Sequence, residues 1–335
     1  MKHFNKIYIF RPGALGDILI ASPLFYCLKL QFPNSKLILI SEQGTRLNHV
    51  TAKMVIDLIP EIDSTILYPN VSVFKKFLFF RKNIDYLDNN ALVYLNYSRC
   101  TSLHVLRDYF FFKAIGFKNT YSFWNYIKNS SISKKRFIPE FQRLFNITTD
   151  LTGTNKLPVD FILNSTDVTK KNSFKIFSAP FGKAKSKRWP IERYEKLYNE
   201  LGALGYEIII CGSKDEEKEF TEIGWSHKSY IKGLFGLQFI ELVENIKDSI
   251  IYVGNDTGPM HLAALLKIPC IAIFSDTNRD TNWIPYGYGH EILRIEVECG
   301  NCQSEICKFK TNKCMTDITF EEVQSKLKKR LVYND

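Results

Sequence analysis

The stretch KIYIFRPGALGDILIASPLFYCLKLQF, residues 6–32, decides the fold class. After Lys6, residues 7–10 are apolar, β-branched or aromatic, which predicts a buried strand over 6–10. Apolar residues then recur at helical spacing between Asp17 and Gln31. A strand, a glycine-containing turn and a helix in this order are typical of a βαβ unit with a parallel sheet.

The same alternation recurs along the chain and predicts two α/β domains. In the first half, further strands are expected at 36–40 and 91–97, with a helix over 105–117. The stretch from about 119 to 172 is rich in Asn, Ser, Thr and Lys and is expected to be irregular, with the domain connection near its end.

After this stretch the alternation starts again. The sequence predicts strands at 174–180, 206–212, 249–254 and 269–274, and helices at 191–205, 215–224 and 259–267. The last helix is expected over 319–332, where Thr319 and Glu322 have the spacing of a capping box.

Composition restricts the function classes. The chain has 335 residues, enough for two domains, and a formal net charge of +10. That charge favours nucleic acid, acidic lipid or phosphorylated small molecules as partners, unless it is only a solvated lysine-rich surface. No apolar run is long enough for a membrane span, and the N-terminus does not resemble a signal peptide, which predicts a cytoplasmic protein.

The turn after the first strand, Arg11–Asp17, is the first candidate site. Gly13 and Gly16 leave backbone N–H groups free for a ligand at the start of a helix. The spacing is neither that of a dinucleotide-binding fingerprint nor that of a P-loop. The alternative is that Asp17 is only a helix N-cap.

The second candidate is the loop SAPFGKAKSKRWP, residues 178–190. Four cations lie within six residues of one another, and such a loop suits a diphosphate. The alternative is a solvated basic loop, and Trp189 is expected to be a packing anchor.

The third candidate is GNDTGPMH, residues 254–261. Gly254 and Gly258 allow close approach of a ligand, and the Thr257 hydroxyl and exposed N–H groups suit phosphate oxygens. Asp256 and His261 lie near the same position, although a lone histidine there is usually structural.

The fourth candidate is a group of four cysteines near the C-terminus, Cys299, Cys302, Cys307 and Cys314. Their number is compatible with a tetrahedral structural zinc, but their spacing is not that of a zinc ribbon. Packed free thiols explain them equally well.

Three of these motifs, in order, resemble glycosyltransferase family 9, the ADP-heptose:lipopolysaccharide heptosyltransferases. They are RPGALGDILIASPL, KRWP and GNDTGPMHLAALLKIP, and the resemblance covers nearly the whole chain. It implies an α/β GT-B fold, with two Rossmann-like domains facing each other across a cleft. An acceptor-binding domain is expected over 1–165, a nucleotide-sugar-binding domain over 166–318, and a C-terminal helix returning to the first domain over 319–335.

The resemblance also implies residue roles. Asp17 matches the general base, and Lys187 matches the lysine that offsets charge on the departing nucleotide. Arg11, Gly13 and Gly16 fall where members meet an acceptor or a phosphate. The implied donor-binding residues are Gly182, Lys183, Lys187, Glu216, Glu217, Asp256, Thr257, Gly258 and His261.

The implied function is an inverting, metal-independent transfer of heptose from ADP-heptose to an inner-core lipopolysaccharide acceptor. The partners would be the donor, an anionic lipid-linked glycan and the inner face of the inner membrane, with no nucleic acid. Basic residues of the N-terminal half are candidates for acceptor or membrane contacts: Lys75, Lys76, Arg81, Lys82, Arg99 and Arg107. The alternatives are a family member that uses another nucleotide sugar for a capsule, outer-core or protein glycan, and a non-catalytic protein that binds a nucleotide sugar or a glycan.

Overall fold

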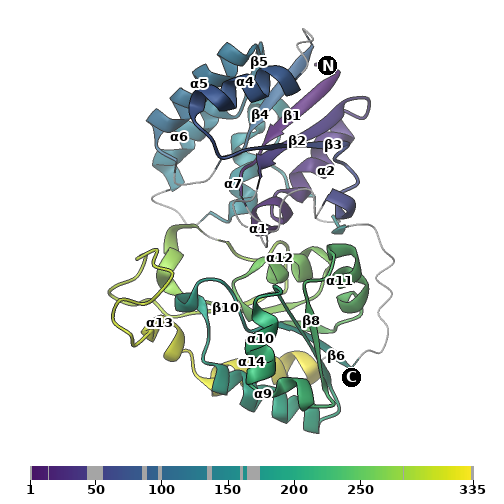
Figure 1. Cartoon of the computed structure of the whole chain (residues 1–335), viewed down its shortest axis with the longest axis vertical. Coiled ribbons are helices and arrows are strands. Elements are labelled where there is room, and N and C mark those ends of the chain that lie inside the picture. Colours follow the sequence, from purple (N-terminus) through teal and green to yellow (C-terminus); the bar gives the residue numbers. More distant parts are fainter. Residues whose placement is uncertain are drawn as a thin grey trace. The chain divides into compact units, whose positions relative to one another are not determined.

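The computed structural model describes residues 2–13, 15–43, 56–84, 89–96, 100–133, 138–158, 161–163, 174–281 and 283–332. The chain divides into two compact units, unit 1 (Met1–Asn164) and unit 2 (Ser165–Asp335). Figure 1 shows the helices and strands of each unit, coloured along the chain.

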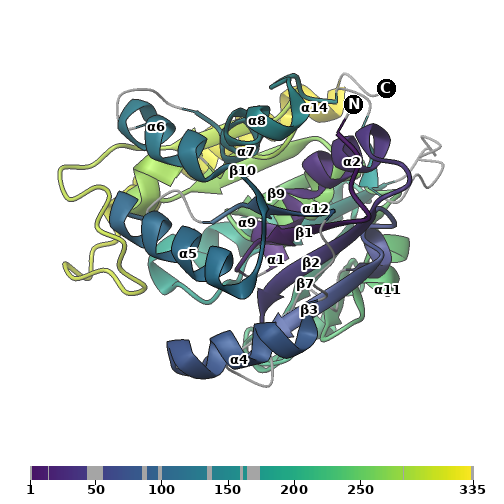
Figure 2. The ribbon, with the colours of Figure 1, turned by 90° about the horizontal axis from the view of Figure 1, so that it is seen from above.

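Unit 1 contains a parallel sheet with the strand order β3-β2-β1-β4-β5. Its strands are β1 (Lys6–Phe10), β2 (Lys36–Glu42), β3 (Ser64–Tyr68), β4 (Asn90–Tyr94) and β5 (Asn119–Tyr121). Its helices are α1 (Leu15–Leu19), α2 (Ser22–Gln31), α4 (Val73–Asn83), α5 (Ser102–Ile115), α6 (Phe123–Ser133), α7 (Glu140–Ile147) and α8 (Thr149–Thr152), with a 3-10 turn at Ile56–Leu58. Figure 2 shows these helices lying on both faces of the sheet.

Two predictions for unit 1 were wrong in detail. The helix expected over 17–31 is divided into α1 and α2, because Pro23 lies in the first turn of α2, where its missing N–H does no harm. The stretch expected to be irregular contains β5 and helices α6 to α8, since tertiary packing stabilises helices of weak intrinsic propensity. The last residue of the strand expected over 91–97 lies outside the described residues.

Unit 2 contains a second parallel sheet, with the order β11-β10-β9-β6-β7-β8. Its strands are β6 (Lys175–Ala179), β7 (Glu207–Gly212), β8 (Ile231–Phe235), β9 (Ile251–Asn255), β10 (Cys270–Phe274) and β11 (Glu291–Arg294). Its helices are α9 (Ile191–Ala203), α10 (Glu216–Glu222), α11 (Phe239–Ile246), α12 (Gly258–Leu265), α13 (Lys313–Thr316) and α14 (Phe320–Val332), with 3-10 turns at Lys185–Lys187, Trp225–His227 and Asp276–Thr281.

Helix α14 contributes to the core of unit 2. Phe320, Val323 and Leu327 are buried in the same cluster as residues of α9 and the sheet. The capping box is confirmed: the backbone N–H of Thr319 donates to the Glu322 carboxylate, and the N–H of Glu322 donates to the Thr319 hydroxyl. The return of this helix to the N-terminal unit stays a prediction.

The strand order explains where the sequence motifs lie. In unit 1 the strands β1, β2 and β3 follow one another outward, and β4 then lies on the opposite side of β1, so the strand order reverses between β1 and β4. In unit 2 the order reverses in the same way between β6 and β9. Ligands of open α/β sheets bind outside the carboxyl ends of the strands at such a reversal. The Arg11–Asp17 turn and the loops after β6 and β9 all lie there.

Candidate functional site

In unit 1, Asp17 lies in the short helix α1, directly after the central strand β1. Gly13 has a φ of 127°, and a Cβ at this position would lie 2.4 Å from the Cγ of Asp17. Only glycine allows the turn to pass so close, so Gly13 leaves room for the Asp17 side chain in this position. That side chain keeps 16% exposure, and the Gly16 carbonyl accepts the N–H of Ile20. Ala14 of the same turn lies outside the described residues.

Arg11 supports Asp17 from below the surface. Its guanidinium is 0% exposed and donates to the backbone carbonyls of Asp17 and Leu95, each at 3.0 Å. Its third nitrogen, Nη2, lies 3.2 Å from Glu140 Oε1 and 3.6 Å from Asp17 Oδ1. The family resemblance implies that Arg11 meets an acceptor or a phosphate, whereas its full burial within unit 1 favours a positioning role.

Glu140 and Arg143 complete this buried network. Both are on α7, and the Arg143 guanidinium makes two bonds of 2.7 Å to the Glu140 carboxylate. Burial by itself raises the pKa of Glu140, but the guanidiniums of Arg143 and Arg11 outweigh it and hold the pKa below its usual value. The sequence reasoning missed both residues because their segment was expected to be irregular; the only signal was their three-residue spacing.

In unit 2, neutral hydrogen bonds connect the loops after β6 and β9. The buried side chain of Asn255 accepts from the backbone N–H of Trp189 and the hydroxyl of Tyr194, at 3.1 and 3.0 Å. Its amide donates to the carbonyl of Pro180 at 2.7 Å. Trp189 is 1% exposed, which confirms the expected packing anchor. Asn255 was not singled out from the sequence.

This connection brings Lys187 and Asp256 together. The Lys187 Nζ lies 2.8 Å from Asp256 Oδ2, and both side chains keep partial exposure. Gly182, with a φ of 149°, passes close to Thr257, where a Cβ would lie 3.3 Å from the threonine methyl group. Helix α12 begins at Gly258, next to Asp256 and Thr257. The free backbone N–H groups of its first turn therefore lie near the Lys187–Asp256 pair.

His261 lies on α12 and is 3% exposed. Burial lowers its pKa to about 4; nearby Asp256 opposes this shift and Lys187 adds to it. Its Nδ1 has no hydrogen-bond partner among the described residues. At neutral pH the structure therefore offers an uncharged imidazole beside the Lys187–Asp256 pair.

The remaining predicted donor residues lie at the edge of this group. Arg188 binds both carboxylate oxygens of Glu219 at 2.8 Å and lies 3.9 Å from Glu216, which also accepts the N–H of Ser213. Glu217 pairs with Lys214, and the exposed side chains of Lys183 and Glu305 form an ion pair at 3.1 Å. The structure therefore brings Glu216 to the loop through Arg188, and engages Glu217 and Lys183 in surface ion pairs.

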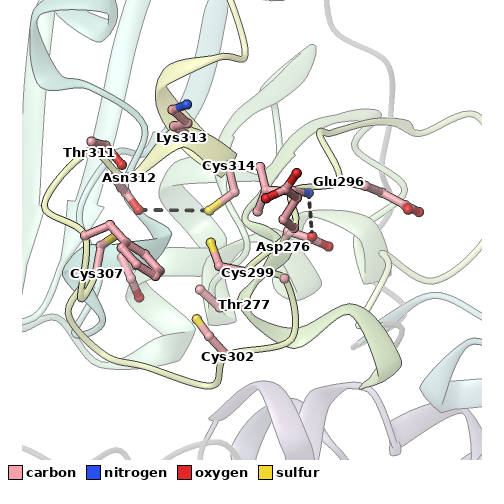
Figure 3. A pocket seen from close by; sticks show the side chains of 15 residues that line it. Asp276, Thr277, Glu296, Cys299, Cys302, Cys307, Thr311, Asn312, Lys313 and Cys314 are labelled. Carbon is pink, nitrogen blue, oxygen red and sulfur yellow. Dashed lines mark hydrogen bonds between the residues drawn. The ribbon is translucent and has the colours of Figure 1, made fainter.

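The four C-terminal cysteines line one pocket of unit 2, together with Asp276, Thr277 and Asn312 (Figure 3). Burial raises the pKa of Cys314, whose Sγ lies 4.0 Å from Asn312 Oδ1. Over the described ranges, however, no three His, Cys, Asp or Glu side chains form a group that could hold a metal ion. The geometry therefore gives the predicted zinc site no support.

The fold recurs in solved structures. A structure of ADP-heptose lipopolysaccharide heptosyltransferase II from Escherichia coli matches with a TM-score of 0.67, 18% identity, and coverage of 98% of this chain and 99% of that one. A family 9 glycosyltransferase from Veillonella parvula matches with a TM-score of 0.71, 16% identity and 99% coverage of both chains. These likenesses show the GT-B fold of two Rossmann-like domains.

The model of Glycosyltransferase family 9 (heptosyltransferase) matches residues 112–313, more than half of the chain. The chain belongs to glycosyltransferase family 9. The resemblance inferred from the three motifs is thus confirmed. This family 9 enzyme is 28% identical to lipooligosaccharide heptosyltransferase 2 of Campylobacter jejuni serotype O:6, over 97% of this chain and 98% of that protein.

No helix in the described part of this family 9 glycosyltransferase has both the length and the apolarity needed to cross a bilayer.

Proposed function

We propose that this family 9 glycosyltransferase moves a heptose from ADP-heptose to a Kdo- or heptose-containing inner-core acceptor of a lipopolysaccharide or lipooligosaccharide. The full-length similarity to a lipooligosaccharide heptosyltransferase 2 carries the proposal. The clustering of Lys187, Asp256, Thr257 and His261 at the strand-order reversal of unit 2 supports it, because diphosphates bind at such positions.

In the proposed reaction, unit 1 holds the acceptor and unit 2 holds the donor. The Asp17 carboxylate takes the proton of an acceptor hydroxyl while that oxygen forms a bond to the anomeric carbon. The bond from this carbon to the diphosphate breaks, ADP leaves with the electron pair, and the anomeric configuration inverts. Lys187 and the N-terminus of α12 offset the charge that develops on ADP, so the proposed reaction is independent of a metal.

Arg11 and Glu140 act behind Asp17 in this proposal. The guanidinium of Arg11 fixes the backbone of Asp17 through its carbonyl and stabilises the carboxylate at 3.6 Å. Glu140 pairs with both Arg11 and Arg143, and together with Asp17 it balances their two positive charges. These residues therefore position the base and do not contact the sugar.

The partners follow from this chemistry. They are the nucleotide-sugar donor, an anionic lipid-linked acceptor and the inner face of the inner membrane, where the protein would act as a peripheral cytoplasmic enzyme. The net charge of +10 favours such anionic partners.

The first test is a thermal-shift panel with ADP, UDP, GDP, CMP and their sugar conjugates, followed by transfer to truncated lipooligosaccharide acceptors. We expect a selective rise with ADP and ADP-heptose, and heptosylated product. A rise in melting temperature with UDP or GDP compounds instead would indicate another donor sugar and another glycan product. Donor binding without transfer to any core acceptor would favour a non-catalytic role.

Elemental analysis of the purified protein decides between the two interpretations of the four cysteines. About one zinc per chain would support a structural site at Cys299, Cys302, Cys307 and Cys314, with the thiols closer together than in this structure. A zinc-free preparation that binds donor would identify them as free thiols.

A further inference from the structure

The outer surface of α4, α5 and α6 in unit 1 differs from the rest of that unit. The rings of Phe77 and Phe111 lie 6.2 Å apart, which joins α4 to α5, and those of Tyr109 and Trp124 lie 5.4 Å apart, which joins α5 to α6. The three helices therefore lie side by side, as the two views of the ribbon also show (Figure 1, Figure 2). We call the solvent-facing side of these helices the α4–α6 face.

Large apolar side chains are concentrated on the α4–α6 face. Among the described residues of unit 1, seven large apolar side chains are exposed, and six of them are here, at 52% to 79% exposure: Val73, Phe74, Leu78, Leu103, Phe110 and Trp124. Soluble domains rarely gather exposed apolar residues in this way unless the surface binds something. The rest of the described surface of unit 1 contributes only Leu30.

The helices that form this face are basic, although Arg107 is paired with Asp108. The three helices contain seven Lys or Arg residues and a single acidic residue, Asp108. On α4, the exposed Lys75 and Lys82 flank the exposed Phe74 and Leu78, and residues 69–84 contain no Asp or Glu. Of the basic residues singled out from the sequence, Arg99 lies outside the described residues.

We propose that the α4–α6 face docks on an anionic lipid bilayer, with its apolar side chains in the headgroup region and its lysines against lipid phosphates. Helices that lie in a membrane interface combine Trp, Phe and Leu with Lys and Arg in this manner. Anionic lipid attracts each Lys or Arg near the surface by about 1 kcal/mol. A second copy of this chain fits less well, because two copies of the face would bring like charges together.

This inference deepens the proposed function, since it assigns the peripheral membrane attachment of the enzyme to one surface. It does not involve Asp17 or Lys187. Its test uses vesicles without any sugar acceptor, so membrane docking can fail while glycosyl transfer is confirmed, or the reverse.

The experiment measures co-sedimentation of the full chain with sucrose-loaded vesicles of phosphatidylcholine alone or with 30% phosphatidylglycerol. We expect binding to the anionic vesicles only, and its loss at 1 M salt, where the screening length falls to about 3 Å. Brominated lipid should quench tryptophan fluorescence, and Trp124→Phe should remove that quenching. Equal binding to both vesicles, or binding to neither, would overturn the proposal.

Two double variants test the face itself. Lys75→Glu with Lys82→Glu should weaken anionic-vesicle binding at least about 25-fold, because two favourable charges are lost. Phe74→Asn with Leu78→Asn should weaken it about tenfold or more, because buried apolar area is lost. The matched controls in unit 2 are Lys328→Glu with Lys329→Glu on α14 and the exposed Leu204→Asn.

Circular dichroism and thermal shift with ADP establish that each variant is folded. Controls that lose as much binding as the α4 variants would show a non-specific charge effect and reject the surface. Sedimentation velocity without lipid tests whether a second copy of the chain binds this face. A dimer that the α4 variants dissociate, together with no vesicle binding, would identify the face as a contact between two copies.

Discussion

The regions around Asp17 in unit 1 and around Lys187 in unit 2 are held in opposite ways. Asp17 rests on a buried network of charges, in which Glu140 binds both Arg11 and Arg143 with almost no solvent contact. The loops around Lys187 are held by the neutral side chain of Asn255, while Lys187 and Asp256 stay partly exposed.

This difference separates stability from ligand binding. Removing one partner of a buried ion pair leaves an uncompensated charge, so changes at Glu140 or Arg143 should affect folding as well as activity. A partly exposed ion pair contributes little to stability, so changes at Lys187 should chiefly affect the binding and use of the nucleotide sugar.

The largest effect is expected for Asp17→Asn. Loss of a general base should lower kcat about 10²- to 10⁴-fold, while ADP binding and thermal stability stay near the wild-type values. Steady-state transfer assays and the ADP thermal shift measure these quantities. A variant that keeps full activity, or one that loses ADP binding, would refute the assigned role.

Glu140→Gln should have the next largest effect. It leaves Arg11 and Arg143 buried without their common anion, which should cost about 3–5 kcal/mol of unfolding free energy. The matched control is Glu219→Gln, whose two carboxylate oxygens both contact Arg188 Nη1 but which is 42% exposed, and this change should cost less than about 1 kcal/mol. Urea unfolding of both variants tests the comparison, and equal losses would abolish it.

Lys187→Ala should weaken donor use without weakening the fold. We expect kcat/KM for the donor to fall about 10²-fold, because a cation that faces the developing charge is lost. Lys185→Ala, an exposed lysine of the same 3-10 turn, should change it little. If the two lysines behave alike, the loop acts as a diffuse positive charge and the Lys187–Asp256 pair has no special role.

The smallest effect concerns pH. The pKa of His261 falls from 6.5 to about 4 on folding, so the unfolded chain binds more protons between these values and stability decreases as the pH falls through this range. From pH 6.5 to pH 5 the loss from this residue should be about 1–2 kcal/mol. His261→Gln should remove this part of the pH dependence, whereas the exposed His104→Gln should not. Urea midpoints at both pH values provide the measurement.

The sequence predicted the parts of both sites that local patterns encode. The turn after β1, the basic loop after β6 and the glycine-rich turn after β9 each follow an apolar strand. All three lie at the carboxyl ends of strands in the middle of their sheets, as expected. The capping box at Thr319 also depends only on neighbours in the chain.

The support of these sites could not be predicted, because it comes from distant residues. Glu140 reaches Arg11 across 129 positions, and Asn255 reaches Trp189 across 66. No local periodicity indicates which glutamate balances which arginine. The break between α1 and α2 could have been inferred, since Pro23 in the middle of an expected helix predicts a new start.

The thiols around the C-terminal pocket have a practical consequence for work with the purified enzyme. Cys299 and Cys302 are exposed and separated by two residues, whereas Cys314 is buried. Air oxidation therefore has two accessible sulfurs to attack, and covalent links between molecules can form there. Without a reductant, the molecular mass from gel filtration would then depend on how far the sample had oxidised during storage. The subunit number of this glycosyltransferase is best determined with the thiols kept reduced.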